Sequence, residues 1–562
     1  MISRRDALEA IGGERFDVLV IGGGITGAGV GLDAASRGYS VALVERDDYA
    51  VGTSSRSSKM VHGGLRYLQN FDLGLVREAL LERQLMVQLA PHLVYPTPFL
   101  IPTLGDARRD RRYSVGLNMY DVMATTRVGR GRRERAARRE AEDYWAPDRH
   151  RQISGDEVAE LVPALADLKP KSAYLFYDCQ TDDARLVLTI LGEAERFGAV
   201  CVNGAEVTEV LEEDGTASGV ACVDADSGER LEIAADNVVN ATGVWADRIR
   251  PEEIEAEEDV PRISPSRGTH VTVSFERLPL EEAACIVPAG EERTIFALPW
   301  YGRALIGTTD NDYDGEIDRP RPGADDIEYL LGATNDYFET DLGLGDLTGA
   351  YAGVRPLIAT GDPRKSVDIS RKAELYETSS GMITITGGKL TTWRRMAKQA
   401  VDRLVEREER EAPCRTAEIP LGMSARPEDL EPPDGLEEEA LPEGALAQLA
   451  FRYGHAARDV LALAAERPEL SRPIAPGRPD LLAEAVVAAR SEQARSVADV
   501  LLRRTRLGIV AAPELRGAGS VLAVAEAIGS ELGWRGRRAR KEAEAWVEAA
   551  RAEGVDPAAG VS

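Results

Sequence analysis

The sequence is poor in cysteine, histidine and lysine. It has five Cys and five His, and the cysteines are widely separated with no C-x-x-C pair, so we expect neither a disulfide framework nor a zinc, iron–sulfur or other metal site. Eight of the 68 Lys and Arg residues are Lys, and the formal net charge is −27. Such an acidic surface argues against nucleic acid as a partner and suggests a halophilic, salt-adapted protein.

Long apolar runs are also missing. No segment approaches the ~20 apolar residues that a membrane-spanning helix needs. The start, MISRRDALEAIGGERFDVLVIGGG, reaches glycines after too short an apolar run for a signal peptide or a twin-arginine leader. We therefore expect a cytoplasmic protein, and its 562 residues with 43% hydrophobic side chains predict two or three globular domains.

A strand, a glycine turn, a helix and a second strand open the chain. Phe16–Ile21 and Tyr39–Val44 have the pattern of buried strands, Ala28–Ser36 is a small-residue helix, and Glu45 follows the second strand. This order predicts a dinucleotide site, where glycines let pyrophosphate approach a helix N-terminus and the acid bonds a ribose hydroxyl. The alternative is a plain glycine turn in an α/β protein. The glycines are Gly22, Gly24 and Gly27.

Two later segments repeat the design of a strand that runs into a small-residue turn. They are Asn237–Gly243 (NVVNATG) and Met382–Lys389 (MITITGGK), and they suggest that the chain returns to the same site, although two ordinary turns would look alike. Between them, Gly268–Phe275, Thr294–Trp300 and Arg303–Gly307 alternate like antiparallel strands. The predicted fold class is α/β, with a Rossmann-type lobe interleaved with an antiparallel-sheet lobe.

The C-terminal part has a different composition. A segment rich in Pro, Glu and Asp, about residues 409–443, predicts a linker. After it, apolar residues recur at three- and four-residue spacing, which predicts an all-helical cap over residues 444–562.

The segment SSKMVHGGLRY places Lys59, His62 and Arg66 within eight residues of an otherwise acidic, Lys-poor chain. Such a cluster raises the question of which anion it binds. Together with six other segments it identifies a family resemblance. VIGGGITGAG, TSSRSSKMVHGGLRYL, YDCQTDDARLVL, VNATGVWAD, IGTTDNDYDG, AGVRPL and GGKLTTWR, in this order, resemble the FAD-dependent glycerol-3-phosphate dehydrogenases, from about Phe16 to near Gly508.

The resemblance implies FAD as the cofactor, bound where the two lobes join. It implies a composite region over residues 14–408, with FAD-binding parts at about 14–105, 170–250 and 346–408 and a substrate sheet at about 260–345. The pyrophosphate would lie on Gly22, Gly24 and Gly27, and Glu45 would bind the adenosine ribose. The other implied FAD contacts are Thr53, Ser54, Ser57, Ser58, Gly243, Gly388, Lys389, Leu390 and Thr391.

The implied substrate is sn-glycerol 3-phosphate, so the anion of the cationic cluster would be a phosphate. Planar guanidinium forks match phosphate oxygens, and the resemblance assigns the phosphate to Tyr67, Arg355 and Arg371. Arg355 could instead pair with an acidic residue, and Arg364 or Lys365 could replace Arg371.

Oxidation of a secondary alcohol requires loss of the hydroxyl proton as a hydride leaves carbon. His62 is the candidate base, and Arg66 and Lys389 would stabilise charge near the hydroxyls and the flavin. Two alternatives stay open: His62 orients the substrate while a perturbed Arg or a water takes the proton, or His62 is a structural histidine.

The resemblance also implies that electrons pass to membrane quinone in glycerol catabolism. An Arg-rich segment, residues 108–139, flanks an apolar stretch and could lie on an anionic membrane or dock a partner subunit; a solvated helix is the alternative. We expect a peripheral protein on the inner face of the cell membrane, with a quinone or electron-transfer subunits as partners and a homodimer as the assembly. The competing functions are an oxidase that uses oxygen, a relative acting on another α-hydroxy or α-amino acid, and a non-catalytic flavin-binding subunit.

Overall fold

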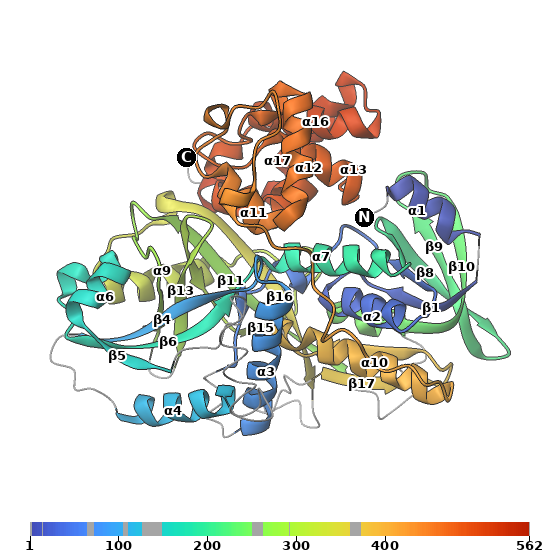
Figure 1. Cartoon of the computed structure of the whole chain (residues 1–562), viewed down its shortest axis with the longest axis horizontal. Coiled ribbons are helices and arrows are strands. Elements are labelled where there is room, and N and C mark those ends of the chain that lie inside the picture. The colour runs from blue at the N-terminus through green and yellow to red at the C-terminus, as the bar shows by residue number, and fades with distance from the viewer. Residues whose placement is uncertain are drawn as a thin grey trace.

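A largely parallel sheet forms the first lobe, on the right of Figure 1. The computed structural model describes residues 3–13, 15–64, 72–104, 111–125, 149–249, 262–290, 293–359 and 373–560. The strand order is β17-β18-β10-β1-β2-β7; β17 alone on this path is antiparallel to its neighbour, and the β8–β9 hairpin extends β10. The strands are β1 (Phe16–Ile21), β2 (Val41–Val44), β7 (Val200–Val202), β8 (Ala205–Glu213), β9 (Thr216–Asp224), β10 (Arg230–Asn240), β17 (Ala373–Glu377) and β18 (Ile383–Gly387).

Helices cover this sheet with small and aliphatic residues. α2 (Ile25–Ser36) is almost wholly buried and packs against α7 (Asp183–Arg196) and α10 (Trp393–Arg407). α1 (Arg4–Ile11) packs near β7. The parallel order brings the carboxyl ends of β1, β2, β10 and β18 to one edge, which is where α/β proteins bind ligands.

The second sheet forms the lobe on the left of Figure 1. Its order is β15-β11-β14-β13-β12-β4-β6-β3, with β16 also on β11 and β5 on β6; its pairs are antiparallel except β12 with β4. The strands are β3 (Met60–Val61), β4 (Tyr95–Thr103), β5 (Arg151–Ser154), β6 (Ser172–Gln180), β11 (Arg262–Ser274), β12 (Ala284–Pro288), β13 (Thr294–Trp300), β14 (Arg303–Gly307), β15 (Asn311–Asp312) and β16 (Leu347–Ala359).

This sheet draws on more of the chain than the predicted range 260–345. It takes β3 to β6 from residues 60–180 and β16 from 347–359. The predicted range omits β4 and β6, which pair with each other about 75 residues apart, because a local pattern does not show which distant strand is the partner. The helices α6 (Gly155–Leu161) and α9 (Ala324–Phe338) accompany it, and α9 packs on β11 and β12.

Two further helices lie at the lower side of Figure 1. α3 (Leu73–Leu89) begins at Asp72, whose side chain accepts the N–H of Leu75 at 3.2 Å. α4 (Arg111–Thr125) packs on α3 and lies at the edge of the view opposite the C-terminal helices.

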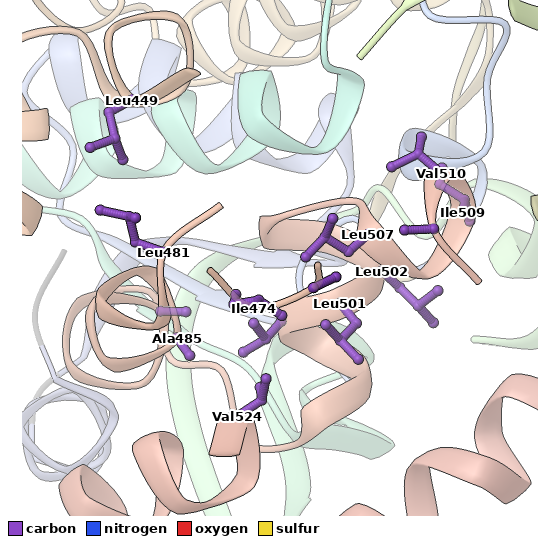
Figure 2. Close-up of a cluster of buried hydrophobic side chains, with 14 of the residues drawn as sticks. Leu449, Ile474, Leu481, Ala485, Leu501, Leu502, Leu507, Ile509, Val510 and Val524 are labelled. Atoms are coloured by element: carbon purple, nitrogen blue, oxygen red, sulfur yellow. The ribbon is translucent and has the colours of Figure 1, made fainter. Parts of the chain in front are cut away.

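The C-terminal helices form a separate layer, orange to red in Figure 1. Figure 2 shows their aliphatic core, in which the buried residues Leu449, Ala485, Leu507 and Val524 come from different helices. The helices are α11 (Ala445–Tyr453), α12 (Ala457–Glu466), α13 (Leu482–Ser491), α14 (Val497–Asp499), α15 (Leu507–Val510), α16 (Ala518–Leu532) and α17 (Gly536–Glu553).

The predicted α/β fold class with a C-terminal helical region is confirmed. β13 and β14 have the predicted bounds, whereas α2 begins at Ile25 rather than Ala28 because Gly24 already caps it. The long predicted C-terminal helices are interrupted where Gly454, Gln493 and Arg506 adopt positive φ angles of 56°, 56° and 67°. Within the described ranges, no helix is both long and apolar enough to cross a bilayer.

Candidate active site

A cavity of about 350 Å³ opens at the carboxyl ends of the parallel strands. The glycine turn after β1, the end of β2, the loop of residues 51–57, the turn after β10 and the turn after β18 all line it. Of the residues predicted to contact FAD, those that line the cavity are Gly22, Gly24, Glu45, Thr53, Ser54, Ser57, Gly243, Gly388, Lys389 and Leu390.

The first glycine turn leaves the backbone free to approach a ligand. Gly22 has φ of 111°, and a Cβ at Gly27 would lie 1.9 Å from the carbonyl oxygen of Gly22, so Gly27 permits close packing of α2 on β1. The N–H of Ile25, in the first turn of α2, donates to Ser54 Oγ at 2.9 Å. The positive end of α2 therefore faces the cavity wall, as a pyrophosphate site requires.

Glu45 closes the other end of the same βαβ unit. Its Oε2 accepts the N–H of Gly23 at 2.7 Å, and its Oε1 accepts the N–H of Asp47 at 2.9 Å. Burial raises the pKa of Glu45 to about 7, and the two backbone N–H groups partly oppose this rise. A carboxylate fixed in this way retains lone pairs for ribose hydroxyls.

The two later turns lie beside the first because β10 pairs with both β1 and β18. Thr386 Oγ donates to the carbonyl of Gly243 at 3.0 Å, which ties the two turns together. Gly387 and Gly388 have φ angles of 77° and 70°, and a Cβ at Gly388 would lie 2.4 Å from Met396 Sδ. Only glycine suits this turn, and the turn places Lys389 at the cavity.

His62 lies directly after β3, where its backbone meets the last of these turns. Its N–H donates to Thr391 Oγ1 and its carbonyl accepts from the same hydroxyl, both at 3.3 Å. Thr391 belongs to the GGKLTT motif and lies two residues after Lys389. Its hydroxyl therefore joins the HGG turn to the edge of the cavity.

Arg355 lies on β16, and hydrogen bonds and an ion pair hold it among the described residues. Its Nη1 lies 3.1 Å from Asp310 Oδ1, and its Nη2 donates to the carbonyl of Thr309 at 3.1 Å. A Cβ at Gly268 would lie 2.5 Å from Nη2, so this glycine provides the space for the guanidinium group. The alternative of an Arg–acid pair is thus present here, and the Arg355 side chain is 24% exposed.

Three predicted residues, Arg66, Tyr67 and Arg371, lie outside the described residues, as do Arg364 and Lys365. The Oγ of Ser58 lies 2.8 Å from Nε2 of the buried His270, and the FAD contact of Ser58 stays a prediction.

A buried ion cluster supports the loop that carries Thr53 to Ser58. Ser57 donates from its N–H and its Oγ to Asp183 Oδ2, at 3.1 and 2.7 Å. Lys59 Nζ also bonds Asp183 Oδ2 at 2.8 Å, and Arg506 of the C-terminal helices bonds Asp183 Oδ1 at 2.8 Å and the carbonyl of Ser55 at 2.8 Å. The motif YDCQTDDARLVL, which contains Asp183, therefore holds this loop in place. Burial lowers the pKa of Lys59 to about 7.

Sequence reasoning missed a second group at the cavity, formed by Arg46, Trp245 and Arg248. Asp318 of the sheet lobe accepts from Arg46 at 3.0 Å, from Trp245 Nε1 at 2.6 Å and from Arg248 at 3.2 Å. The position of Arg46 directly after Glu45 could have indicated this group from the sequence. Asp318 lies 272 residues from Arg46, and no local pattern connects the two residues.

The cavity fits FAD on the chain's own features. A glycine-lined helix N-terminus suits a pyrophosphate, Glu45 suits a ribose, and Lys389 lines the cavity at the turn that Thr391 bonds to His62. A bound flavin supplies the hydride acceptor in such sites.

Comparison with known proteins agrees with this geometry. The family model described as "FAD dependent oxidoreductase" matches residues 17–418, and "C-terminal domain of alpha-glycerophosphate oxidase" matches residues 384–539. The chain is 38% identical over 538 residues to glycerol-3-phosphate dehydrogenase 2 of Mycobacterium tuberculosis, covering 94% of this chain and 87% of that one. It is 33% identical over 551 residues to glycerol-3-phosphate dehydrogenase of Synechocystis sp., covering 95% and 96%.

Among solved structures, the glycerol-3-phosphate dehydrogenase of Bacillus halodurans complexed with FAD superposes with a TM-score of 0.74 at 28% identity, covering 98% of this chain and 97% of that one. A structure of L-alpha-glycerophosphate oxidase from Mycoplasma pneumoniae shares the fold, with a TM-score of 0.52 at 17% identity, over 70% of this chain and 95% of that one. With the cavity, the strand–turn units and these matches in agreement, the chain belongs to the FAD-dependent glycerol-3-phosphate dehydrogenase family.

Proposed function

We propose that this protein oxidises sn-glycerol 3-phosphate at C2 to dihydroxyacetone phosphate, with FAD as hydride acceptor and membrane quinone as the final acceptor in glycerol catabolism. The observation that carries the proposal is the Thr391–His62 contact, which brings the HGG turn against the GGKLTT turn at the flavin cavity. Two cationic motifs, widely separated in sequence, meet there beside a site built for a dinucleotide.

In this proposal the chain's own residues bind the phosphate and handle the proton. Arg355, with Tyr67 and Arg371, holds the phosphate, and the pair with Asp310 keeps the Arg355 guanidinium in one orientation. His62 takes the hydroxyl proton, and its backbone is already fixed by Thr391. Arg66 and Lys389 stabilise negative charge on the substrate oxygen and near the flavin.

The outer face of α4 supports contact with a membrane. Val115, Met119 and Val122 lie on it at helical spacing and are 62%, 38% and 54% exposed. Apolar side chains of this kind, next to the Arg-rich sequence of residues 108–139, fit an anionic bilayer surface. The same face would bring the protein to its quinone.

The test is anaerobic addition of sn-glycerol 3-phosphate to the purified, FAD-replete protein in concentrated salt, followed by flavin absorbance. Bleaching by the phosphate ester, and by neither glycerol nor lactate, is the expected result. Flavin that dithionite reduces but the ester leaves oxidised would reject the substrate and favour a non-catalytic subunit or another alcohol.

Reoxidation then identifies the acceptor. A soluble quinone analogue should reoxidise the reduced flavin much faster than oxygen does. Fast reoxidation by oxygen with stoichiometric peroxide would instead make the protein an oxidase.

A further inference from the structure

Helix α4 has two different faces. While Val115, Met119 and Val122 point outward, Tyr120 and Ala124 pack inward on Val76 and Leu80 of α3. The Tyr120 side chain is 2% exposed, and its ring lies edge-on to Phe176 of β6 at a centroid distance of 6.3 Å. The inward face of α4 therefore brings one polar atom, the Tyr120 hydroxyl oxygen, into an otherwise apolar contact with α3 and β6.

That polar atom reaches the HGG turn. The N–H of Gly63 donates to Tyr120 Oη at 2.9 Å and approaches Asp178 Oδ1 at 3.2 Å. A Cβ at Gly63 would lie 2.5 Å from Tyr120 Oη and 2.4 Å from Leu80 Cδ2. The second residue of HGG is thus glycine because α3 and α4 occupy the space of a side chain.

Asp178 of β6 fixes the tyrosine in turn. Tyr120 Oη donates to the Asp178 carboxylate, with distances of 2.9 and 2.8 Å to its two oxygens, and Arg83 of α3 pairs with the same carboxylate. Arg83 also donates to the carbonyl of Tyr177 at 2.9 Å. Burial first, and then the Asp178 charge, raise the pKa of Tyr120 well above its usual value, so the hydroxyl keeps its proton.

The peptide between His62 and Gly63 is consequently held at both ends. Its carbonyl accepts from Thr391 on one side, and its N–H donates to Tyr120 on the other. Since a peptide unit is planar, hydrogen bonds from opposite sides fix the orientation of its plane. They therefore also fix the direction in which the His62 side chain leaves the backbone.

We propose that Tyr120 is a positioning residue that fixes the His62–Gly63 peptide for oxidation of the substrate, so that α4 supports the active site from outside the cavity as well as presenting an exposed surface. The inference rests on the proposed function, because it assigns His62 to that reaction. Tyr120 touches neither the cavity nor the reacting atoms. It acts through the backbone of the HGG turn.

The experiment compares Tyr120→Phe with wild type as FAD-replete enzymes in anaerobic stopped-flow reduction by sn-glycerol 3-phosphate. Phe keeps the ring contacts and removes one hydrogen bond. We expect the limiting rate of flavin reduction to fall about tenfold, since small misplacement of a catalytic group is costly, while the half-saturating substrate concentration changes less than about twofold. The pH profile of reduction should also shift, because the His62 environment changes.

Tyr329→Phe is the matched control, because its hydroxyl donates to the carbonyl of Ala289 at 2.9 Å in the far part of the sheet lobe. Gly63→Ala is the second variant: its Cβ must displace the Tyr120 hydroxyl without altering the tyrosine itself, and it should slow reduction at least as much. If Tyr120→Phe does not fold, Gly63→Ala still tests the positioning role.

The outcomes separate the two proposals. If wild type is reduced and Tyr120→Phe and Gly63→Ala, folded and FAD-replete, match Tyr329→Phe in rate and pH profile, the positioning role is overturned. If wild type itself is not reduced by the ester, the proposed substrate fails, and that result does not depend on any Tyr120 variant.

Discussion

Two helical regions are attached to the flavin-binding core, and they are attached by different means. The C-terminal helices, residues 445–560, are joined to it by buried ion pairs: Arg504 with Asp48, and Arg506 with Asp183. Helix α4 is joined by apolar contacts, since Leu117 enters the large core and Tyr120 packs on α3, and by hydrogen bonds of Tyr120 and Asp121. Among the exposed large apolar side chains, Val115, Met119 and Val122 lie on α4 and Leu532 lies on the C-terminal helices.

The difference has a physical basis. Breaking a buried ion pair leaves an uncompensated charge, so the C-terminal helices cannot separate from the core cheaply. Helix α4 is held by apolar contacts and hydrogen bonds, and in the proposed function its exposed Val115, Met119 and Val122 would gain from a partner or a bilayer. The two regions lie on opposite sides of the molecule in Figure 1.

The largest effect is expected from Arg506→Met. A harmless substitution at this position would contradict the difference between the C-terminal helices and α4. Arg506→Met leaves Asp183 without one of its two cations, and it removes one of the two donors to the carbonyl of Ser55, the other being Lys59 Nζ. We expect a loss of about 3–5 kcal/mol in unfolding free energy and faster release of FAD, measured by chemical unfolding and by flavin retained after gel filtration.

Arg490→Met is the control, because Arg490 pairs with Glu531 at 2.8 Å while 52% exposed. It should change stability by no more than about 0.5 kcal/mol. Equal effects of the two substitutions would contradict the role of the buried cluster.

The outer face of α4 is tested by the triple change Val115→Ser, Met119→Ser and Val122→Ser. Loss of three apolar side chains should weaken binding to anionic vesicles about 10²-fold, measured by co-sedimentation in moderate salt. Flavin reduction by the substrate should be unchanged, because these side chains point away from Tyr120. Unchanged vesicle binding would remove α4 as the docking surface.

On the substrate side, Arg355→Lys keeps the charge and removes the planar fork. We expect KM for sn-glycerol 3-phosphate to rise about tenfold with little change in the limiting rate of flavin reduction. The Asp310 pair can persist with Lys, so folding should be preserved. A fall in the limiting rate alone would place Arg355 near the reacting carbon rather than the phosphate.

On the cofactor side, the smallest effect is the pH dependence of FAD affinity. The pKa of Glu45 is raised to about 7 without a ligand, and a ribose hydroxyl donates best to the ionised carboxylate. As pH falls below 7, Glu45 takes up a proton that FAD must displace, so affinity should fall by up to about tenfold per pH unit and be flat above pH 8.

Fluorescence titration of the apoprotein measures this dependence. Glu45→Gln should bind FAD more weakly at pH 8 and lose the slope between pH 6 and 7. A slope that persists in Glu45→Gln would assign the titration to another group.

How far the site could be predicted varies with the origin of each part. The turn at Gly22 to Gly27 and its acid Glu45 were predictable because strand, turn and helix occupy one continuous segment. The Asp318 contacts to Arg46 and Trp245 were not, because residues from two lobes meet only after folding. The breaks near Gln493 and Arg506 were missed for a related reason: tertiary contacts hold non-glycine residues at positive φ there.

The sequence by itself determined the α/β class and the dinucleotide turn, because local hydrophobic period and glycine spacing act over a few tens of residues. The family and the cofactor followed from the resemblance of seven motifs to a known family. Only the tertiary structure decided that Thr391 bonds His62, that Tyr120 bonds Gly63, and that Arg506 supports the loop that carries Thr53 to Ser58. Those contacts join residues 57 to 451 positions apart in the chain, and packing, rather than any local pattern, brings them together.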